Sequence, residues 1–311
     1  MSTNHVPVFG FVGVTASKSS INHVFPRWAK ALGLGDVRFD PIDLDPATPA
    51  ETYREVLGRI KDDPDYRGAL VTTHKVRLLR AARDMFDTLD DHATLLGEVS
   101  CLSKRGDRFI GHAKDVITAG RSMDDFIPDD HFEQSGGHVL CLGAGGAGLA
   151  IAVHLLTTSP RSGSPERIVL VNRSQPRLEE CAEVLTGLGI ADRVDLVQNS
   201  DPHRNDELCA ALPPGSMVIN ATGMGKDRPG SPLTDSVRFP RHGLVWELNY
   251  RGDLEFLHQA EAKAGQYQLT IEDGWRYFVH GWSEVVSEVF DIPLTPAVLE
   301  RLAAEAESVR S

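Results

Sequence analysis

The feature that most constrains the fold is a glycine-rich turn in the middle of the chain, Gly143-Ala144-Gly145-Gly146-Ala147-Gly148. The apolar segment His138–Leu142, a predicted buried strand, directly precedes it, and the apolar stretch Leu149–Val153 follows. The pattern GxGxxG is a weak signal alone and a much stronger one between a strand and a helix. Glycine lets the backbone approach a pyrophosphate, which the free N–H groups of the helix then bind. We therefore predict a Rossmann-type dinucleotide-binding domain, in preference to a turn that only packs a helix on a sheet.

The end of the next predicted strand, Ile168–Val171, indicates which dinucleotide is bound. It is followed by Asn172-Arg173-Ser174, with Arg177 one turn later. An NAD site usually has Asp or Glu here to bind the ribose hydroxyls, whereas guanidinium groups suit the 2′-phosphate of NADP. We expect NADP, with NAD possible, and these four residues as contacts; solvated surface arginines are the alternative.

A second turn is predicted to lie near the nicotinamide. It reads Asn220-Ala221-Thr222-Gly223-Met224-Gly225 and follows the short predicted strand Met217–Ile219. Thr222, Gly223 and Met224 are its candidate contacts, although a purely structural turn fits the same residues. Gly225-Lys226 lacks the first glycine of a phosphate loop, which excludes a nucleoside triphosphatase.

Strand-like and helix-like segments alternate along the chain, which predicts an α/β fold with a largely parallel sheet in the first third. The expected strands there are Pro7–Val14, Val37–Leu44 and Ala69–Thr73, and the helices are Ile21–Leu34, Thr52–Lys61 and Val76–Met85. Short strands at Ser100–Ser103 and Arg108–Gly111, a helix from Asp115 to Phe126, and linker-like residues at 127–130 and 134–137 follow. The second half alternates again and ends in helices Trp275–Phe290 and Ala297–Val309.

These patterns predict two α/β domains. Residues 1–114 with 275–311 form the N-terminal substrate domain, and residues 115–274 form the Rossmann-type NADP-binding domain with a parallel sheet. The oligomeric state is not readable from the sequence.

Composition narrows the partners and the compartment. The formal charge of −12, from 32 basic and 44 acidic residues, weighs against a nucleic-acid partner. We see no secretory signal and no apolar stretch of membrane-spanning length, so we expect a cytoplasmic protein without a membrane partner. The four cysteines form no CxxC pair, which predicts buried thiols and no metal site.

Five stretches resemble, in the right order, motifs of the shikimate/quinate dehydrogenase family, and together they cover nearly the whole chain. Gly143–Gly148 with Asn172–Arg177 resembles its NADP fingerprint. Ser17-Lys18-Ser19 with His23 resembles its SxS motif, and Val71–Lys75 resembles its VTxPHK stretch without the proline. Gly111–Asp115 resembles its GxNTDG stretch, and Asp273-Gly274 resembles its DG…Q segment.

The resemblance implies a catalytic pair, Lys75 and Asp115. The Lys75 ammonium would stabilise charge on the reacting oxygen and donate the proton, and Asp115 would orient the lysine and accept a bond from the substrate hydroxyl. Ser17 and Ser19 would bind a substrate carboxylate, although helix N-capping fits serines equally well. Thr72 would contact a ring hydroxyl. Tyr250, in Trp246–Tyr250, resembles the tyrosine of the family's DxVYNP stretch, and a core tyrosine is the alternative.

The chain departs from the family pattern on the substrate side. Ser100 and Cys101 replace an Asn-Thr pair, Ala113-Lys114 replace another, and Gly281 replaces a glutamine for which His280 or Tyr277 would substitute. Removing hydroxyl partners redirects substrate choice. We expect an NADP-dependent oxidoreductase that interconverts a cyclic hydroxy acid and its keto form, with shikimate, quinate or a modified analogue as substrate. The alternative is a catalytically silent paralogue that binds NADP(H) or a cyclic acid.

Overall fold

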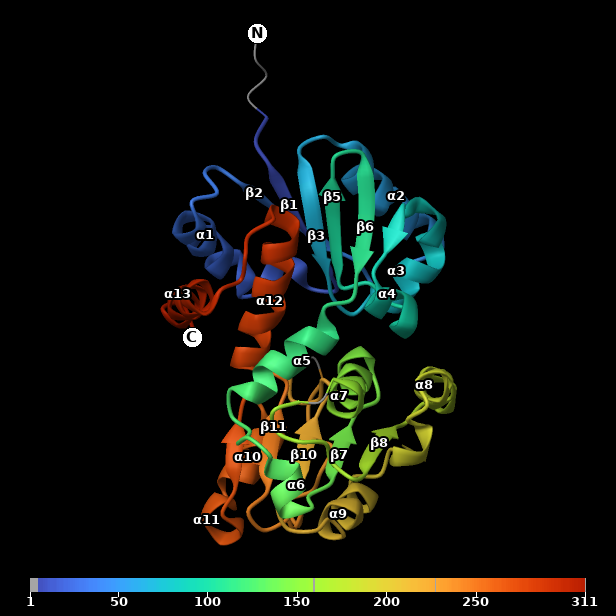
Figure 1. The fold of residues 1–311 in the computed structure, drawn as a ribbon, viewed down its shortest axis with the longest axis vertical. Helices are drawn as coiled ribbons and strands as arrows, with labels where there is room; N and C mark the ends of the chain where they lie inside the picture. The colour runs from blue at the N-terminus through green and yellow to red at the C-terminus, as the bar shows by residue number, and fades with distance from the viewer. Residues whose placement is uncertain (1–4, 159, 227, 311) are drawn as a thin grey trace. The chain divides into compact units, whose positions relative to one another are not determined.

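The computed structural model describes residues 5–158, 160–226 and 228–310, which fold into two compact units (Figure 1). Unit 1 contains the described residues up to Lys114 together with those from Val279 onward. Unit 2 runs from Asp115 to Phe278. Each unit is built around its own six-stranded sheet.

The sheet of unit 1 has the strand order β2-β1-β3-β5-β6-β4. Its first three strands are parallel, whereas β5 runs antiparallel to both of its neighbours. The strands are β1 (Val8–Gly13), β2 (Arg38–Asp43), β3 (Tyr66–Val71), β4 (Thr88–Leu89), β5 (Cys101–Arg105) and β6 (Arg108–His112).

Helices cover both faces of this sheet: α1, α12 and α13 lie on one side and α2, α3 and α4 on the other (Figure 1). An aromatic cluster fills the first side, because Phe9 on β1 contacts Phe25 of α1 and both Trp282 and Phe290 of α12. The helices are α1 (Ile21–Leu32), α2 (Ala50–Asp62), α3 (Lys75–Ala82), α4 (Asp91–Leu96), α12 (Trp275–Phe290) and α13 (Pro296–Glu307), with short 3-10 turns η1 (Ala16–Lys18) and η2 (Arg83–Met85).

The sheet of unit 2 is entirely parallel, in the order β12-β11-β10-β7-β8-β9. Its central strands are short, apolar and buried, as expected where helices cover both faces of a parallel sheet. The strands are β7 (Val139–Leu142), β8 (Ile168–Asn172), β9 (Val194–Gln198), β10 (Met217–Asn220), β11 (Leu244–Glu247) and β12 (Thr270–Glu272).

The helices of unit 2 pack on these strands through apolar faces. Leu140, Val218 and Val245 share one core cluster with Cys209 and Phe256 from two of the helices. The elements are α5 (Asp115–Asp124), α6 (His131–Ser135), α7 (Gly146–Thr157), α8 (Gln175–Gly187), η3 (Ala191–Arg193), α9 (Pro202–Ala210), α10 (Glu255–Glu261) and α11 (Ala264–Tyr267). The strand order and the helices that cover the sheet confirm the predicted α/β fold with a Rossmann-type unit.

The first sheet is largely parallel, as predicted, except for β5, which runs antiparallel to its neighbours. β5 and β6 form a hairpin whose tight turn carries Gly106 at a φ of 60°, and a tight turn joins antiparallel strands. Two other expectations need correction. The linker expected at 134–137 is partly helical, since α6 ends at Ser135. Neither Ser17 nor Ser19 caps α1, whose N-cap residue is Ser20.

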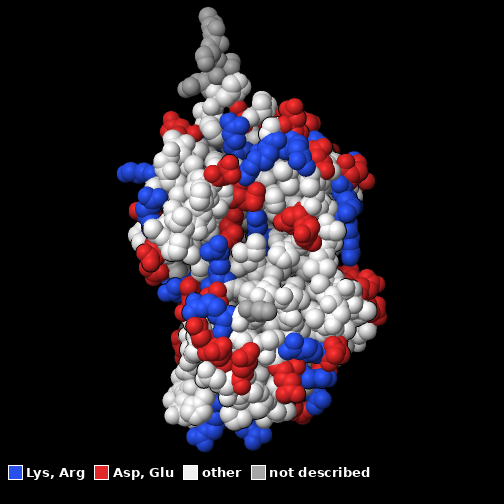
Figure 2. Space-filling model, viewed as in Figure 1, with Lys and Arg blue, Asp and Glu red and all other residues white. Residues whose placement is uncertain are grey.

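The cysteines and the surface agree with the composition. All four cysteine side chains are buried, as predicted, and they are free thiols. Acidic and basic side chains are interspersed over the face shown in Figure 2. In the part of the chain that the structure describes, no helix combines the length and the apolar character needed to cross a bilayer.

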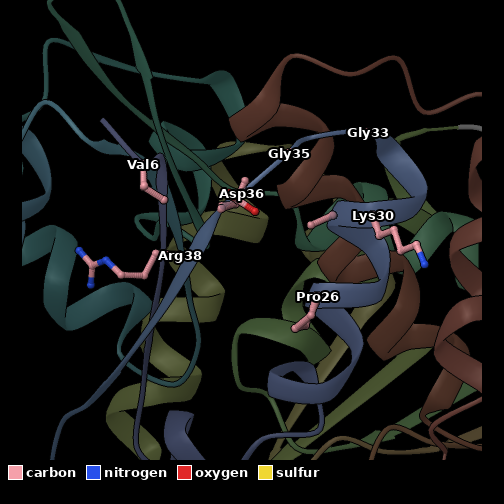
Figure 3. A pocket seen from close by; sticks show the side chains of 9 residues that line it. Val6, Pro26, Lys30, Gly33, Gly35, Asp36 and Arg38 are labelled. Carbon is pink, nitrogen blue, oxygen red and sulfur yellow. The ribbon is translucent and has the colours of Figure 1, made fainter. Parts of the chain in front are cut away.

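A surface hollow of about 740 Å³ lies on unit 1 between the end of α1 and the start of β2. Pro26, Lys30, Asp36 and Arg38 line it (Figure 3). It therefore sits at the amino ends of β1 and β2. Ligands of open α/β sheets bind at the opposite, carboxyl edge, so we do not assign the candidate site to this hollow.

Candidate functional site

The carboxyl edge of the unit 2 sheet has a topological switch point between β7 and β10, because the chain continues from β7 to β8 on one side and returns to β10 on the other. Such switch points hold the ligand in doubly wound folds. Two turns meet there: the glycine-rich turn follows β7, and Ala221-Thr222 follows β10. The Ala221 N–H donates to the Leu142 carbonyl, at 2.7 Å, which fixes the two turns side by side.

Three glycines of the first turn have separate structural reasons to lack a side chain. Gly143 has a φ of 112°, and an added Cβ would lie 2.5 Å from the Ala221 carbonyl oxygen. A Cβ on Gly148 would lie 2.0 Å from the Gly143 carbonyl oxygen, so this glycine allows α7 to pack closely on the turn. Gly145, the N-cap residue of α7, has no such neighbour among the described atoms within 4 Å. It borders open space, as the approach of a pyrophosphate requires.

Gly146 and Ala147 form the first turn of α7, whose leading N–H groups have no partner within the helix. The first turn of a 12-residue helix therefore presents donors and a partial positive charge at the switch point. The structure brings together all five predicted residues of the glycine-rich turn.

The predicted phosphate-binding residues lie after β8, on the same edge. Asn172 accepts a hydrogen bond from the Ser174 N–H at 3.2 Å, which shapes the turn, and the Arg173 side chain is exposed. Arg177 behaves differently. Its Nε donates to the Ala144 carbonyl at 2.8 Å and its Nη1 to Glu180 at 2.9 Å. Arg177 thus braces the glycine-rich turn, while Arg173 is the more accessible cation.

The Thr222–Met224 turn is held by polar bonds from within. Asn220 Oδ1 accepts bonds from both the Thr222 N–H and the Thr222 hydroxyl, at 3.1 and 2.6 Å, and the Met224 N–H donates to Thr222 Oγ1 at 3.1 Å. Gly223, with a φ of 75°, reverses the chain between them.

Glu247, at the end of β11, holds this turn through hydrogen bonds to Asn220 and Asn249. The sequence did not point to Glu247. The fully buried carboxylate accepts bonds from Asn220 Nδ2, Asn249 Nδ2 and the Asn249 N–H, all at 2.7 Å. Both amides also donate to the Met224 carbonyl, at 3.2 and 2.9 Å. Burial raises the pKa of Glu247 to about 7, against the opposing effect of these hydrogen bonds.

The two predicted tyrosines take part in aromatic packing within unit 2. The Tyr250 ring lies 4.5 Å from that of Phe278 and 5.8 Å from that of Trp275, and Tyr277 packs on Trp246 at 5.5 Å. Both remain half-buried. These contacts favour a packing role for the two rings.

Unit 1 has a switch point of its own, between β1 and β3, because β2 lies beyond β1 and the chain then crosses to β3. The loop after β1 contains Ser17 and Ser19, and Thr72 follows β3. The two loops are close together, since a Cβ added to Gly13 at the end of β1 would lie 2.8 Å from Thr72 Oγ1.

Ser17 is bound to an acidic residue on the neighbouring strand. Its N–H donates to Asp43 Oδ1 at 2.9 Å and its hydroxyl to Asp43 Oδ2. The hydroxyl bond is the main cause that lowers the pKa of Asp43. Ser19 is buried, and its N–H donates to the Ala16 carbonyl. The sequence did not point to Asp43.

Lys75 begins α3 directly after a strained turn. Thr73 has a φ of 53°, a conformation that a β-branched residue rarely adopts, and the His74 N–H donates to the Thr72 carbonyl across the turn. Non-glycine residues held in this region cluster at functional sites.

The buried His74 fixes the end of this turn. Its Nε2 donates to the Leu44 carbonyl at 3.1 Å, which leaves Nδ1 to accept the Tyr53 hydroxyl proton at 2.7 Å. Burial lowers the pKa of His74 and so favours this neutral form. These two bonds therefore hold His74, the residue directly before Lys75 and the N-cap of α3, in place.

The remaining predicted residues lie where β6 ends. Ser100 is buried, and its hydroxyl accepts the Lys114 N–H at 2.8 Å. The Lys114 side chain is held by Glu288 at 2.7 Å. Because β6 runs parallel to β3, Lys114 lies at the same carboxyl edge as Thr72, and Asp115 is the next residue along the chain.

The fold and these two edges define a class of protein: a two-unit α/β protein with a Rossmann-type dinucleotide cradle in one unit and a polar strand edge with a lysine in the other. No family model matches the chain. The chain is 30% identical over 273 residues to the shikimate dehydrogenase (NADP(+)) of Arthrobacter sp. strain FB24, covering 87% of this chain and 85% of the relative. It is also 30% identical over 209 residues to the enzyme of that name from Symbiobacterium thermophilum, covering 67% and 64%.

A solved structure has the same fold. Quinate dehydrogenase from Corynebacterium glutamicum in complex with NAD superposes with a TM-score of 0.73 at 21% identity, covering 97% of this chain and 99% of that one. The chain belongs to the shikimate dehydrogenase family, as its motifs predict.

Proposed function

We propose that the protein is an NADP-dependent oxidoreductase that interconverts a secondary hydroxyl and a carbonyl on a small hydroxylated ring compound of the shikimate and quinate type, or on a modified analogue. The observation that carries this proposal is the cradle at the unit 2 switch point. There Gly145 opens onto free space before α7, beside the Thr222–Met224 turn. The relatives named as NADP(+) enzymes support it.

NADP is favoured over NAD by the residues after β8. Asn172 stands where an NAD site usually has an acid, and the exposed Arg173 offers a planar donor group for a 2′-phosphate. Because the solved quinate dehydrogenase is in complex with NAD, the experiment includes NAD as the comparison cofactor. When bound, the cofactor supplies or accepts the hydride.

Lys75 and Asp115 carry the proton chemistry in this proposal. During carbonyl reduction the Lys75 ammonium stabilises the charge that develops on oxygen and gives it a proton; during alcohol oxidation it takes that proton back. Asp115 orients the lysine and accepts a bond from the substrate hydroxyl. The strained turn at Thr73 and the two hydrogen bonds of His74 hold the backbone directly before Lys75. They support a fixed position for Lys75 before any ligand binds.

The test follows reduced cofactor by absorbance, with NADP⁺ and NAD⁺ each offered with shikimate, quinate and an amino-substituted analogue. We expect turnover with NADP⁺ and a loss of roughly 100-fold or more in kcat for Lys75→Ala. Lys30→Ala, which removes an exposed lysine at the other edge of the sheet, is the matched control. Cofactor binding without turnover of any compound would instead support the catalytically silent paralogue.

A further inference from the structure

We propose that Glu247 is a positioning residue for the dinucleotide: it fixes the shape of the Thr222–Met224 turn that receives the nicotinamide half, without touching the cofactor itself. The inference rests on the proposed function, which places the dinucleotide at the unit 2 switch point. It gives the buried carboxylate a task beyond the stability of the strand end where it lies.

Asparagines donate the hydrogen bonds that Glu247 accepts. The strand register pairs Glu247 on β11 with Asn220 on β10. One carboxylate oxygen accepts from Asn220 Nδ2, and the other accepts from Asn249 Nδ2 and the Asn249 N–H, each at 2.7 Å. A carboxylate is an acceptor only, so each asparagine must turn its NH2 group, and not its carbonyl oxygen, toward Glu247. The carboxylate therefore sets the orientation of both amides.

The orientation of Asn220 in turn decides the shape of the Thr222–Met224 turn. With its NH2 group on Glu247, Asn220 points Oδ1 at Thr222 and accepts the N–H and the hydroxyl, at 3.1 and 2.6 Å. Because the Thr222 hydroxyl proton is used in this bond, its oxygen serves as the acceptor for the Met224 N–H, at 3.1 Å. If the Asn220 amide were reversed, its NH2 group would face the Thr222 N–H and that bond would be lost.

The same two amides also hold the other end of the turn. Asn220 Nδ2 and Asn249 Nδ2 both donate to the Met224 carbonyl, at 3.2 and 2.9 Å. Gly223 lies between the two bonded ends with a φ of 75°, and a Cβ added to it would meet no described atom within 4 Å. The turn is thus braced by the Glu247 network and borders open space at Gly223, where a ligand ring can approach the backbone closely.

Burial explains why these bonds are specific to the turn. Glu247, Asn220 and Asn249 are all buried, and a buried carboxylate is strongly destabilising unless it is hydrogen-bonded. Apolar side chains of similar shape would fill the same space at little or no cost in stability. A polar network that only filled the strand end would therefore have no advantage. Its distinctive product is the fixed direction of the amides that hold Thr222 and Met224.

The experiment compares two ligands by calorimetry: NADPH, and 2′-phospho-ADP-ribose, which has the same phosphate groups and lacks the nicotinamide. The reduced nicotinamide is uncharged, so the two ligands carry the same charge. The titrations are run at about pH 8.5, above the pKa of about 7 to which burial raises Glu247, so that the carboxylate is ionised. We expect the wild-type protein to bind NADPH roughly tenfold more tightly than the fragment.

Glu247→Gln keeps the shape of the side chain and replaces one acceptor oxygen with an NH2 group, which would face an asparagine donor. It should abolish the preference for NADPH and leave the affinity for the fragment unchanged. Glu183→Gln makes the same chemical change at an exposed position of α8 and should behave as wild type.

Thr222→Val tests the same series of bonds if Glu247→Gln does not fold. It removes the hydroxyl that Asn220 holds and leaves Glu247 in place. This variant should also lose most of the preference for NADPH while it binds the fragment as wild type does. A general loss of stability would not separate the two ligands in this way.

Loss of the NADPH preference in Glu247→Gln, with normal affinity for the fragment, would support the assignment of Glu247. Absence of turnover with any ring compound would then contradict only the proposed oxidoreductase. Equal losses for the two ligands, or a preference that the variant keeps, would overturn the inference and leave the oxidoreductase standing. Equal affinity of the wild type for both ligands would overturn it too, because the nicotinamide would gain nothing at this turn. Failure of the wild type to bind either ligand would overturn it together with the NADP assignment.

Discussion

Gly148 packs directly against Gly143: a Cβ added to Gly148 would lie 2.0 Å from the Gly143 carbonyl oxygen. We predict that Gly148→Ala lowers the free energy of unfolding by about 1–3 kcal/mol, because the helix must move off the turn. In an unconstrained helix the same change would stabilise by about 1 kcal/mol. Thermal unfolding measures the effect. An unchanged or raised melting temperature would contradict the close packing.

Gly145→Ala is the matched substitution, since Gly145 borders open space. It should leave the melting temperature of the free protein nearly unchanged and weaken NADP binding roughly tenfold or more, because the methyl group occupies the space of the pyrophosphate. Fluorescence titration with NADPH measures the binding. Normal affinity in this variant would place the pyrophosphate elsewhere.

Arg173 and Arg177 should have separable effects on the cofactor. Arg173 is exposed, and its replacement by alanine should weaken NADP binding by roughly ten- to hundredfold while NAD binding stays the same. Arg177 bonds the Ala144 carbonyl, so Arg177→Ala should weaken both cofactors and lower the melting temperature. The measurement is the pair of Kd values for each variant. Equal losses for NADP and NAD in Arg173→Ala would show that the 2′-phosphate lies elsewhere.

Glu288 should contribute strongly to the stability of unit 1. It accepts a bond from Lys114 at 2.7 Å and lies 3.2 Å from Arg105 Nη2 and 3.5 Å from His112 Nε2. Burial alone would raise the pKa of Glu288, but the bond from Lys114 and the nearby positive charges lower it. Glu288→Gln leaves a largely buried lysine without its counter-charge and should cost about 2 kcal/mol or more. Denaturant unfolding tests this, with the exposed Glu300→Gln as control, and equal stability of the two variants would refute it.

Glu247 should make the free energy of unfolding fall as the pH rises from about 4.5 to about 7. Burial raises its pKa from an ordinary 4.5 to about 7, so between these values the folded state holds a proton that the unfolded state has released. Stability then decreases with rising pH across this window, by on the order of 3 kcal/mol in total, and stays lower above it. Unfolding free energies of wild type and Glu247→Gln at several pH values isolate the effect. We expect the difference between them to change from pH 4.5 to 7, and a constant difference would contradict the prediction.

The sequence predicts the cofactor cradle well because its chemistry is local. Gly143, Gly145 and Gly148 lie within six residues, and the reasons for glycine at each concern the backbone of that same turn. The strand before it is apolar and the helix after it is largely apolar, which leaves few alternative structures.

Asp43 and Glu247 escape sequence reasoning because their roles depend on partners far along the chain. Asp43 is 26 residues from Ser17, and only the β1–β2 register brings the two together. Glu247 acts through Asn220, 27 residues away on the adjacent strand. The reversal of β5 is also non-local, because parallel and antiparallel strands of this length carry similar patterns. Motif letters therefore single out Ser17 and do not reveal that Asp43 accepts its N–H and its hydroxyl.

The discontinuous make-up of unit 1 has a consequence for the order of folding during synthesis. Unit 2 is one continuous segment from Asp115 to Phe278, whereas the aromatic core around Phe9 includes Trp282 and Phe290 from nearly the end of the chain. A ribosome therefore delivers every strand of unit 1 early, and Trp282 and Phe290 of α12 only after unit 2. The side of Phe9 that packs on these two residues stays uncovered while more than half the protein is made, which leaves apolar surface exposed to aggregation during synthesis.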